Sequence, residues 1–133
     1  MNEYIVISPL YVDLPRKTMK DKTFALSLNK YRNAHYMVLT KVKDEYKRIM
    51  YGKIMALPMF GTISLSFTYY SKTKQLSDID NWCSVNNKLF QDCLSTYGKI
   101  EDDNYNYVPT VSYSYGGLDP NKKGKMVIGI WEL

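Results

Sequence analysis

Residues 62–70 of the 133-residue chain read Thr-Ile-Ser-Leu-Ser-Phe-Thr-Tyr-Tyr, a strict alternation of polar and apolar side chains up to Tyr69. Ile63, Leu65, Phe67 and Tyr69 fall on one side of an extended segment, because successive side chains of a strand point to opposite faces. The pattern predicts a strand with one buried and one exposed face. It is the clearest strand in the sequence, and the remaining elements are placed around it.

A polar run over residues 71–77 ends this strand, and a helix is expected from about Ile79 to Tyr97. Asp78 or Asp80 is a suitable N-cap, and Gly98 is a suitable stop. The apolar positions that line one side of this helix are Val85, Leu89, Phe90, Cys93 and Leu94.

An earlier helix is expected to begin near Asn33 or Ala34, with Asn33 as its N-cap. One face of it carries apolar residues at helical spacing, namely Val38, Leu39, Val42, Tyr46 and Ile49. Upstream, the β-branched run 4–7 predicts a short strand, and residues 24–28 form an apolar patch that suits extended chain. Pro9 and Pro15 interrupt the segment between them.

Two β-rich runs, 107–115 and 126–131, follow the second helix and are expected to form a final antiparallel pair. The order of elements is then strand, helix, strand, helix, strand, strand. It predicts an α+β fold with a mixed β-sheet covered by two helices. A length of 133 residues suits a single domain, 1–133.

The composition places the chain among ordinary globular proteins, with 45% hydrophobic and 23% charged residues. No apolar stretch has the length of a membrane span and the first residues lack a signal peptide, so a cytoplasmic protein is expected. Cys83 and Cys93 lie ten apart in one expected helix, about 15 Å, which is too far for a disulfide. His35 is the only histidine, and this excludes histidine-based triads and zinc motifs.

Charge is unevenly distributed along the chain, which has a net charge of +5. Residues 16–53 contain eleven lysines and arginines against three acids, whereas residues 78–103 contain six acids against two lysines. Two interpretations are open. Either both regions are solvated surface, or the basic half follows phosphates while the acids hold a divalent cation.

The acids have a recognisable order. Asp78-Ile79-Asp80-Asn81 opens the second helix, Lys88 and Asp92 lie within it, and Gly98 and then Glu101-Asp102-Asp103 follow it. This segment resembles the signature of the RusA-like Holliday junction resolvases of phages and prophages. Residues 27–32, Ser-Leu-Asn-Lys-Tyr-Arg, resemble the short motif before that family's first helix, and 126–133 resemble its last strand.

The resemblance covers residues 24 to 133 and leaves 1–23 as an amino-terminal addition. It implies that Asp78, Asp80 and Asp103 are catalytic, metal-binding carboxylates, with Asp102 beside or in place of Asp103. Lys88 would be the catalytic lysine. The family lysine usually stands four residues after the second aspartate, where this chain has Ser84, so Lys88 comes one helical turn late.

The resemblance further implies Mg²⁺ as cofactor, with Mn²⁺ as an alternative ion, and a homodimer that resolves four-way junctions by paired symmetric nicks. No organic cofactor and no membrane partner are expected. Metal-activated water would attack the phosphodiester. The residues expected to contact DNA are Lys30 and Arg32 first, then Arg16, Lys17, Lys20, Lys22, Lys41 and Lys47.

One difficulty is visible in the sequence itself. A straight helix of the expected length would hold its two acidic ends some 25 to 30 Å apart. They would meet only if the helix began later, near Ser84, or if the chain after Gly98 ran back along it. Three other functions stay open: a nuclease for flaps and forks, a non-catalytic protein that binds branched DNA, and a cytosolic domain whose acids are caps and surface charge.

Overall fold

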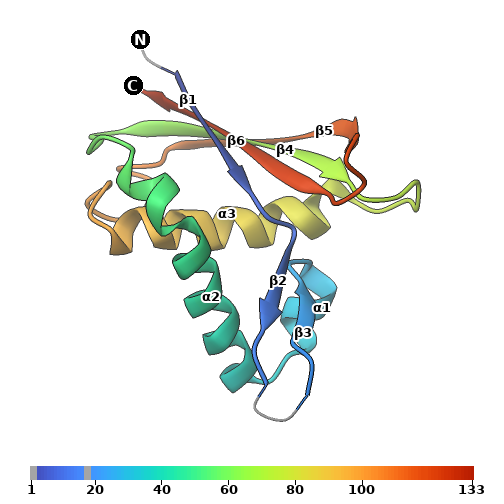
Figure 1. Cartoon of the computed structure of the whole chain (residues 1–133). Helices are drawn as coiled ribbons and strands as arrows, with labels where there is room; N and C mark the ends of the chain where they lie inside the picture. Colours follow the sequence, from blue (N-terminus) through green and yellow to red (C-terminus); the bar gives the residue numbers. More distant parts are fainter. Residues whose placement is uncertain (1–2, 17–18) are drawn as a thin grey trace.

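The computed structural model describes residues 3–16 and 19–133 and contains a four-stranded mixed sheet. Its strands lie in the order β1 (Glu3–Ser8), β6 (Lys125–Glu132), β4 (Ile63–Ser71) and β5 (Thr110–Leu118). β6 runs antiparallel to both β1 and β4, and β5 runs parallel to β4 (Figure 1). The alternating stretch of the sequence is therefore a central strand, and its residues from 63 to 71 are buried at every second position.

The expected antiparallel pair of the last two strands is wrong, because β4 lies between β5 and β6. The cause is α3 (Ile79–Thr96), which carries the chain from the end of β4 back along the sheet. A crossover of this kind delivers the next strand parallel to the first. β5 therefore takes the free edge of β4, and β6 pairs on its other edge.

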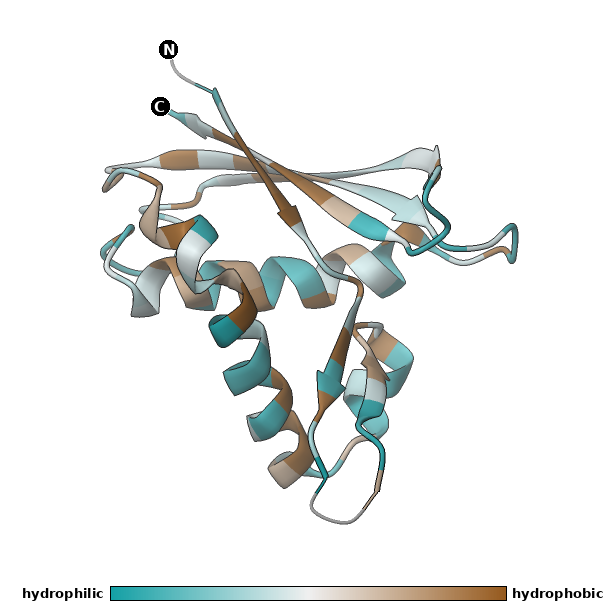
Figure 2. Cartoon of the chain, in the orientation of Figure 1, coloured by the Kyte–Doolittle hydropathy of each residue, from teal (hydrophilic) through white to brown (hydrophobic). Residues whose placement is uncertain are grey.

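The helices of the described chain lie on one face of the sheet (Figure 1). The apolar side of α3 packs beneath β4, where the rings of Phe67 and Phe90 meet edge to face at 6.2 Å. α2 (Tyr36–Met55) crosses α3 and buries Val42, Tyr46 and Met50, on the face that the sequence predicts. In Figure 2 apolar residues mark the side of α2 towards β2, and hydrophilic residues mark its other side.

A smaller unit, called the lower unit here, lies on the side of the helices away from the main sheet (Figure 1). It consists of β2 (Tyr11–Leu14), β3 (Lys22–Ala25) and α1 (Leu28–Asn33). The sequence predicts neither β2 nor α1. The strand has four residues between two prolines, and the helix has six, so neither shows a period. Ser27 caps α1 by accepting a hydrogen bond from the Lys30 backbone amide, at 3.4 Å.

Asn33 is not the N-cap of α2, because it is the last residue of α1. Its side-chain nitrogen donates to the carbonyl oxygen of Asn29 at 2.8 Å. Ala34 is extended, and His35 takes the cap position, with its Nδ1 accepting a hydrogen bond from the Met37 amide at 3.2 Å. The single histidine therefore has a structural role.

The α+β class and the single domain with a mixed sheet are confirmed, and α1 is a third helix beyond the two expected. The stretch before residue 24 supplies β1, an edge strand of the main sheet, as well as β2. Cys83 and Cys93 are both buried and free, as the spacing predicts. In the part of the chain described, no helix combines the length and the apolar character needed to cross a membrane.

Candidate functional site

The first acidic pair lies where β4 gives way to α3. Asp78 occupies the N-cap position and Asp80 the first turn of the helix, and both residues are exposed. Asp78 makes no side-chain capping bond. The ion pairs between described residues use other acids, Asp92 and Glu45. The carboxylates of Asp78 and Asp80 are therefore open to a ligand.

These two carboxylates share a cavity with a basic side chain. The cavity has a volume of about 630 Å³, and Asp78, Asp80 and Arg32 all line it. α1 is docked onto the start of α3 through the amide of Asn29, which donates to Oδ1 of Asn81 at 3.3 Å. This contact brings α1, and with it Arg32, to the same cavity as the acid pair.

The second acidic pair lies at the opposite end of α3. The helix has 18 residues and begins at Ile79, so its ends are about 27 Å apart at 1.5 Å per residue. After Gly98, the amide of Phe60 donates to the carbonyl oxygen of Lys99 at 2.7 Å, which ties the chain to the α2–β4 connection. Neither a late helix start nor a returning loop brings Asp102 and Asp103 to Asp78. Among the described residues, no three acids, cysteines or histidines gather closely enough for one metal ion.

Asp102 instead organises its own turn. Its Oδ1 accepts the backbone amide of Asp103 at 2.8 Å, and its Oδ2 accepts Nδ2 of Asn104 at 3.2 Å. The carboxylate of Asp102 is thus occupied locally, while the side chain of Asp103 is exposed.

Lys88 lies outside the acid cavity. It is eight residues beyond Asp80, about 12 Å along the helix axis, and its Nζ lies 5.4 Å from the centre of the Tyr31 ring. Ser84, at the family position of the lysine, donates its hydroxyl to the carbonyl oxygen of Asp80 at 2.6 Å. Lys88 therefore lies over α1 rather than beside the acids.

The expected DNA-binding residues fall mostly on the lower unit and the start of α2. Arg32 lines the acid cavity, and Lys22 and Lys30 line a second cavity of about 370 Å³. The remaining exposed members are Arg16, Lys20 and Lys41. Lys17 lies outside the described residues.

Lys47 is engaged elsewhere, because its Nζ lies 3.1 Å from Oδ2 of Asp92. Burial lowers the pKa of Lys47, but the hydrogen bond and charge of Asp92 outweigh this and leave its pKa above the ordinary value. The charge of Lys47 is already neutralised by Asp92, so Lys47 is the least available of the expected DNA-binding residues.

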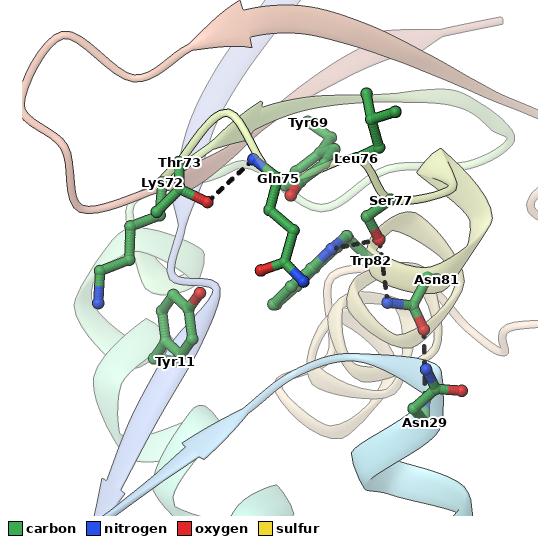
Figure 3. A pocket seen from close by; sticks show the side chains of 10 residues that line it. All are labelled: Tyr11, Asn29, Tyr69, Lys72, Thr73, Gln75, Leu76, Ser77, Asn81 and Trp82. Carbon is green, nitrogen blue, oxygen red and sulfur yellow. Dashed lines mark hydrogen bonds between the residues drawn. The ribbon is translucent and has the colours of Figure 1, made fainter.

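A third cavity, next to the acids, was not predicted. Aromatic residues from three elements line it: Tyr11 from β2, Tyr69 from β4 and Trp82 from α3 (Figure 3). The only signal in the sequence is Trp82 itself, a large aromatic directly after Asp78-Ile79-Asp80-Asn81. The two partner rings are far from it in sequence.

No protein-family model matches the chain, and no curated protein matches it significantly.

Proposed function

We propose that the chain is a magnesium-dependent endonuclease that cuts branched DNA, with four-way junctions as its main substrate. The observation that carries this proposal is the open cavity in which Asp78, Asp80 and Arg32 converge. Two carboxylates and a guanidinium at one opening suit a cation and a phosphate together. The proposed place of action is the cytoplasm of a bacterial host.

The donor set fits magnesium. Mg²⁺ is commonly bound in nucleotide-processing sites by one or two carboxylates, with water and substrate phosphate completing its shell. Asp78 and Asp80 would be those carboxylates. When bound, the ion would supply charge neutralisation and a more acidic water molecule. The guanidinium of Arg32 would hold the phosphodiester by paired hydrogen bonds and orient it for in-line attack, leaving a 5′ phosphate and a 3′ hydroxyl.

The basic side chains of the lower unit would hold the arms of the substrate. Three of them are exposed lysines: Lys30 on α1, Lys22 at the start of β3 and Lys20 in the β2–β3 connection. Lysine contacts of this kind act on the phosphate backbone and depend strongly on salt. Lys88 would contribute charge beside α1 rather than at the metal.

Asp102 and Asp103 can join this site only from a second copy of the chain, since α3 separates them from Asp78 within one copy. A two-fold homodimer whose interface joins the second acidic pair of each copy to the first pair of the other would complete both sites. Paired nicks across a two-fold axis follow from such an arrangement, with one site on each side.

A cleavage assay tests the proposal. The purified protein is incubated with a labelled four-way junction, a flap, a fork and a linear duplex, each with Mg²⁺ or EDTA. We expect metal-dependent cutting of the junction and an intact linear duplex. Asp80→Asn should lower the cutting rate by about 1,000-fold or more, because a bound metal contributes several kcal/mol to the transition state.

Asp44→Asn is the matched control, because Asp44 is an exposed aspartate on α2, outside the cavity. It should cut like the unaltered protein, and Asp80→Asn should still bind the junction. Undiminished cutting by Asp80→Asn would refute the metal site. Tight junction binding without any cut would favour the second candidate, a non-catalytic branched-DNA binder, which the separation of the two acidic pairs supports. Cutting restricted to flaps or forks would keep the nuclease and change its substrate.

A further inference from the structure

We propose that the aromatic cavity beside the acid pair binds one unpaired nucleobase of the DNA strand being cut. This inference rests on the proposed function and adds base recognition to it. The cavity has a volume of about 280 Å³. It shares four residues with the acid cavity, Asn29, Leu76, Ser77 and Asn81. A nucleotide whose phosphate lies at Asp78 and Asp80 therefore has its base within reach of this second opening.

The wall of the cavity is a fixed aromatic surface. The rings of Tyr69 and Trp82 stack at 5.5 Å with an interplanar angle of 16°, and Tyr11 meets Trp82 edge to face at 5.7 Å. Nε1 of Trp82 donates to Oγ of Ser77 at 3.2 Å, which holds the indole in place. Bases stack on such preformed aromatic surfaces without regard to sequence. The wall supplies affinity for a base of any kind.

The rim of the cavity supplies the polar groups. The side-chain amide of Gln75 extends across the opening beside Trp82 (Figure 3). The side-chain amide of Asn81 is already bonded within the fold, because its Nδ2 donates to Oγ of Ser77 and its Oδ1 accepts the backbone amide of Asn29. The backbone of Gln75 is held by Oγ1 of Thr73 at 3.3 Å, while its side-chain amide bonds to no residue of the described chain.

The side-chain amide of Gln75 is therefore available to a ligand, as is that of Asn29 at the boundary with the acid cavity. A glutamine amide carries a donor and an acceptor side by side, which is the arrangement that pairs with a base edge, adenine above all. Lys72 stands at the same opening with its Nζ 5.1 Å from the centre of the Tyr11 ring, and it adds positive charge towards a DNA backbone.

Size and substrate both favour a base over other ligands. The cavity is at or below the lower limit of small-molecule sites, about 300 to 1,000 Å³, so it suits one flat ring system. Moving a base into a protein pocket requires it to unstack and unpair, which costs least where pairing is already interrupted, and a branch point interrupts the duplex. The proposal therefore predicts that the cutting rate depends on which base lies next to the cut.

The first test measures that preference. Four-way junctions carrying each of the four bases at the nucleotides flanking the cut are incubated with the unaltered protein, Gln75→Ala and Gln91→Ala. One base should be preferred by about 5- to 100-fold, the usual discrimination of a good amide–base pair. Gln75→Ala should lose the preference. Gln91→Ala is the matched control, because Gln91 bonds to Asn87 on α3 and does not line the cavity.

The second test needs no catalysis. The affinity of the unaltered protein for junctions is measured in EDTA, with one abasic site moved along the strand. Loss of the recognised base should weaken binding by about 5- to 100-fold at one nucleotide beside the cut, the usual contribution of one stacked base. Distant abasic sites should have no such effect. The same penalty should shrink in Trp82→Phe, which keeps an aromatic ring in the fold.

The outcomes separate the two proposals. Cutting of junctions with equal rates for all bases and no sensitive abasic position would overturn the base pocket and leave the nuclease intact. A sensitive position without cutting would keep the pocket in a binding protein. A protein that binds no junction would overturn both.

Discussion

Cys83 and Cys93 are both buried residues of α3. Sγ of Cys83 is 3.8 Å from the carbonyl oxygen of Phe67 and 3.9 Å from Sδ of Met126. Burial raises the pKa of each thiol from near 9 to about 12, so neither forms a thiolate at neutral pH. Both cysteines act as small apolar side chains of the core.

A dependence of stability on alkaline pH follows from these thiols. Their pKa is higher in the folded than in the unfolded chain, so their stabilisation is complete below pH 9 and is lost as pH rises towards 12. The free energy of unfolding should fall by up to about 1.4 kcal/mol per pH unit and per thiol in this window. Denaturant titrations at pH 8, 9.5 and 11 measure this slope.

Cys93→Ala is the comparison for that slope. It removes one thiol while retaining Tyr69, whose pKa is also raised to about 12 by burial, so the difference between the two slopes isolates the thiol. The variant should start less stable at pH 8 and lose stability more slowly above pH 9. Parallel curves for the two proteins would show that Cys93 ionises as easily in the fold as outside it.

At the scale of the elements, α2 begins with His35 as its N-cap, a residue type that does not mark a helix start in a sequence. His35 is exposed, and its Nδ1 accepts the amide of Met37 at the start of a 20-residue helix. The helix carries no acidic residue in its first turn, so this bond is its main support there. His35→Ala should lower the free energy of unfolding by about 1 kcal/mol, the usual loss for a cap.

The control variant keeps a hydrogen-bond acceptor at position 35 but removes the imidazole ring. His35→Asn should restore most of the lost stability, since asparagine is a strong N-cap. Chemical denaturation at constant pH measures the three proteins. Equal losses in both variants would show that the contact between the tilted rings of His35 and Tyr36, with centroids 4.6 Å apart, matters more than the hydrogen bond.

The elements also show which parts of the fold a sequence can predict. β4 and α3 have long periodic patterns and are predicted at nearly their observed bounds. On α2 the predicted Val42 and Tyr46 are buried, but the helix begins at Tyr36, later than expected. β2 and α1 are too short for a period. The pairing of β5 with β4 depends on the path of α3, which no local pattern records.

The candidate site also has parts that the sequence indicates and a part that it does not. The family resemblance points to Asp78 and Asp80, which line one cavity with Arg32, and helix length indicates the separation of the second acidic pair. The aromatic cavity was not predicted, because Tyr11, Tyr69 and Trp82 meet only after β2, β4 and α3 have packed. Contacts between distant segments are visible in the fold and not in the sequence.

For the whole molecule, the position of the acids makes the oligomeric state part of the proposed chemistry. One copy holds Asp78 and Asp80 at one end of α3 and Asp103 beyond the other end, and the two helix ends are about 27 Å apart at 1.5 Å per residue. If Asp103 is a metal ligand, each complete site must take it from a second copy. A dimer would then contain two shared sites.

Mixing two inactive variants tests this arrangement. Asp80→Asn and Asp103→Asn should each lose cutting alone. In a mixed dimer with shared sites, one site collects both substitutions and the other collects none. An equal mixture, exchanged under mild denaturation, should therefore recover about a quarter of the intact sites, because half the dimers are mixed and half their sites are whole. The recovered product should be single nicks rather than paired ones.

The matched control mixes Asp78→Asn with Asp80→Asn, whose substitutions fall in the same half of the site. No mixed dimer of that pair has a whole site, so the mixture should stay inactive. If Asp103 acts with the acids of its own chain, the first mixture should also stay inactive, although size measurements show mixed dimers. Full activity of Asp103→Asn alone would remove Asp103 from the site and leave the ion to Asp78, Asp80 and the phosphate.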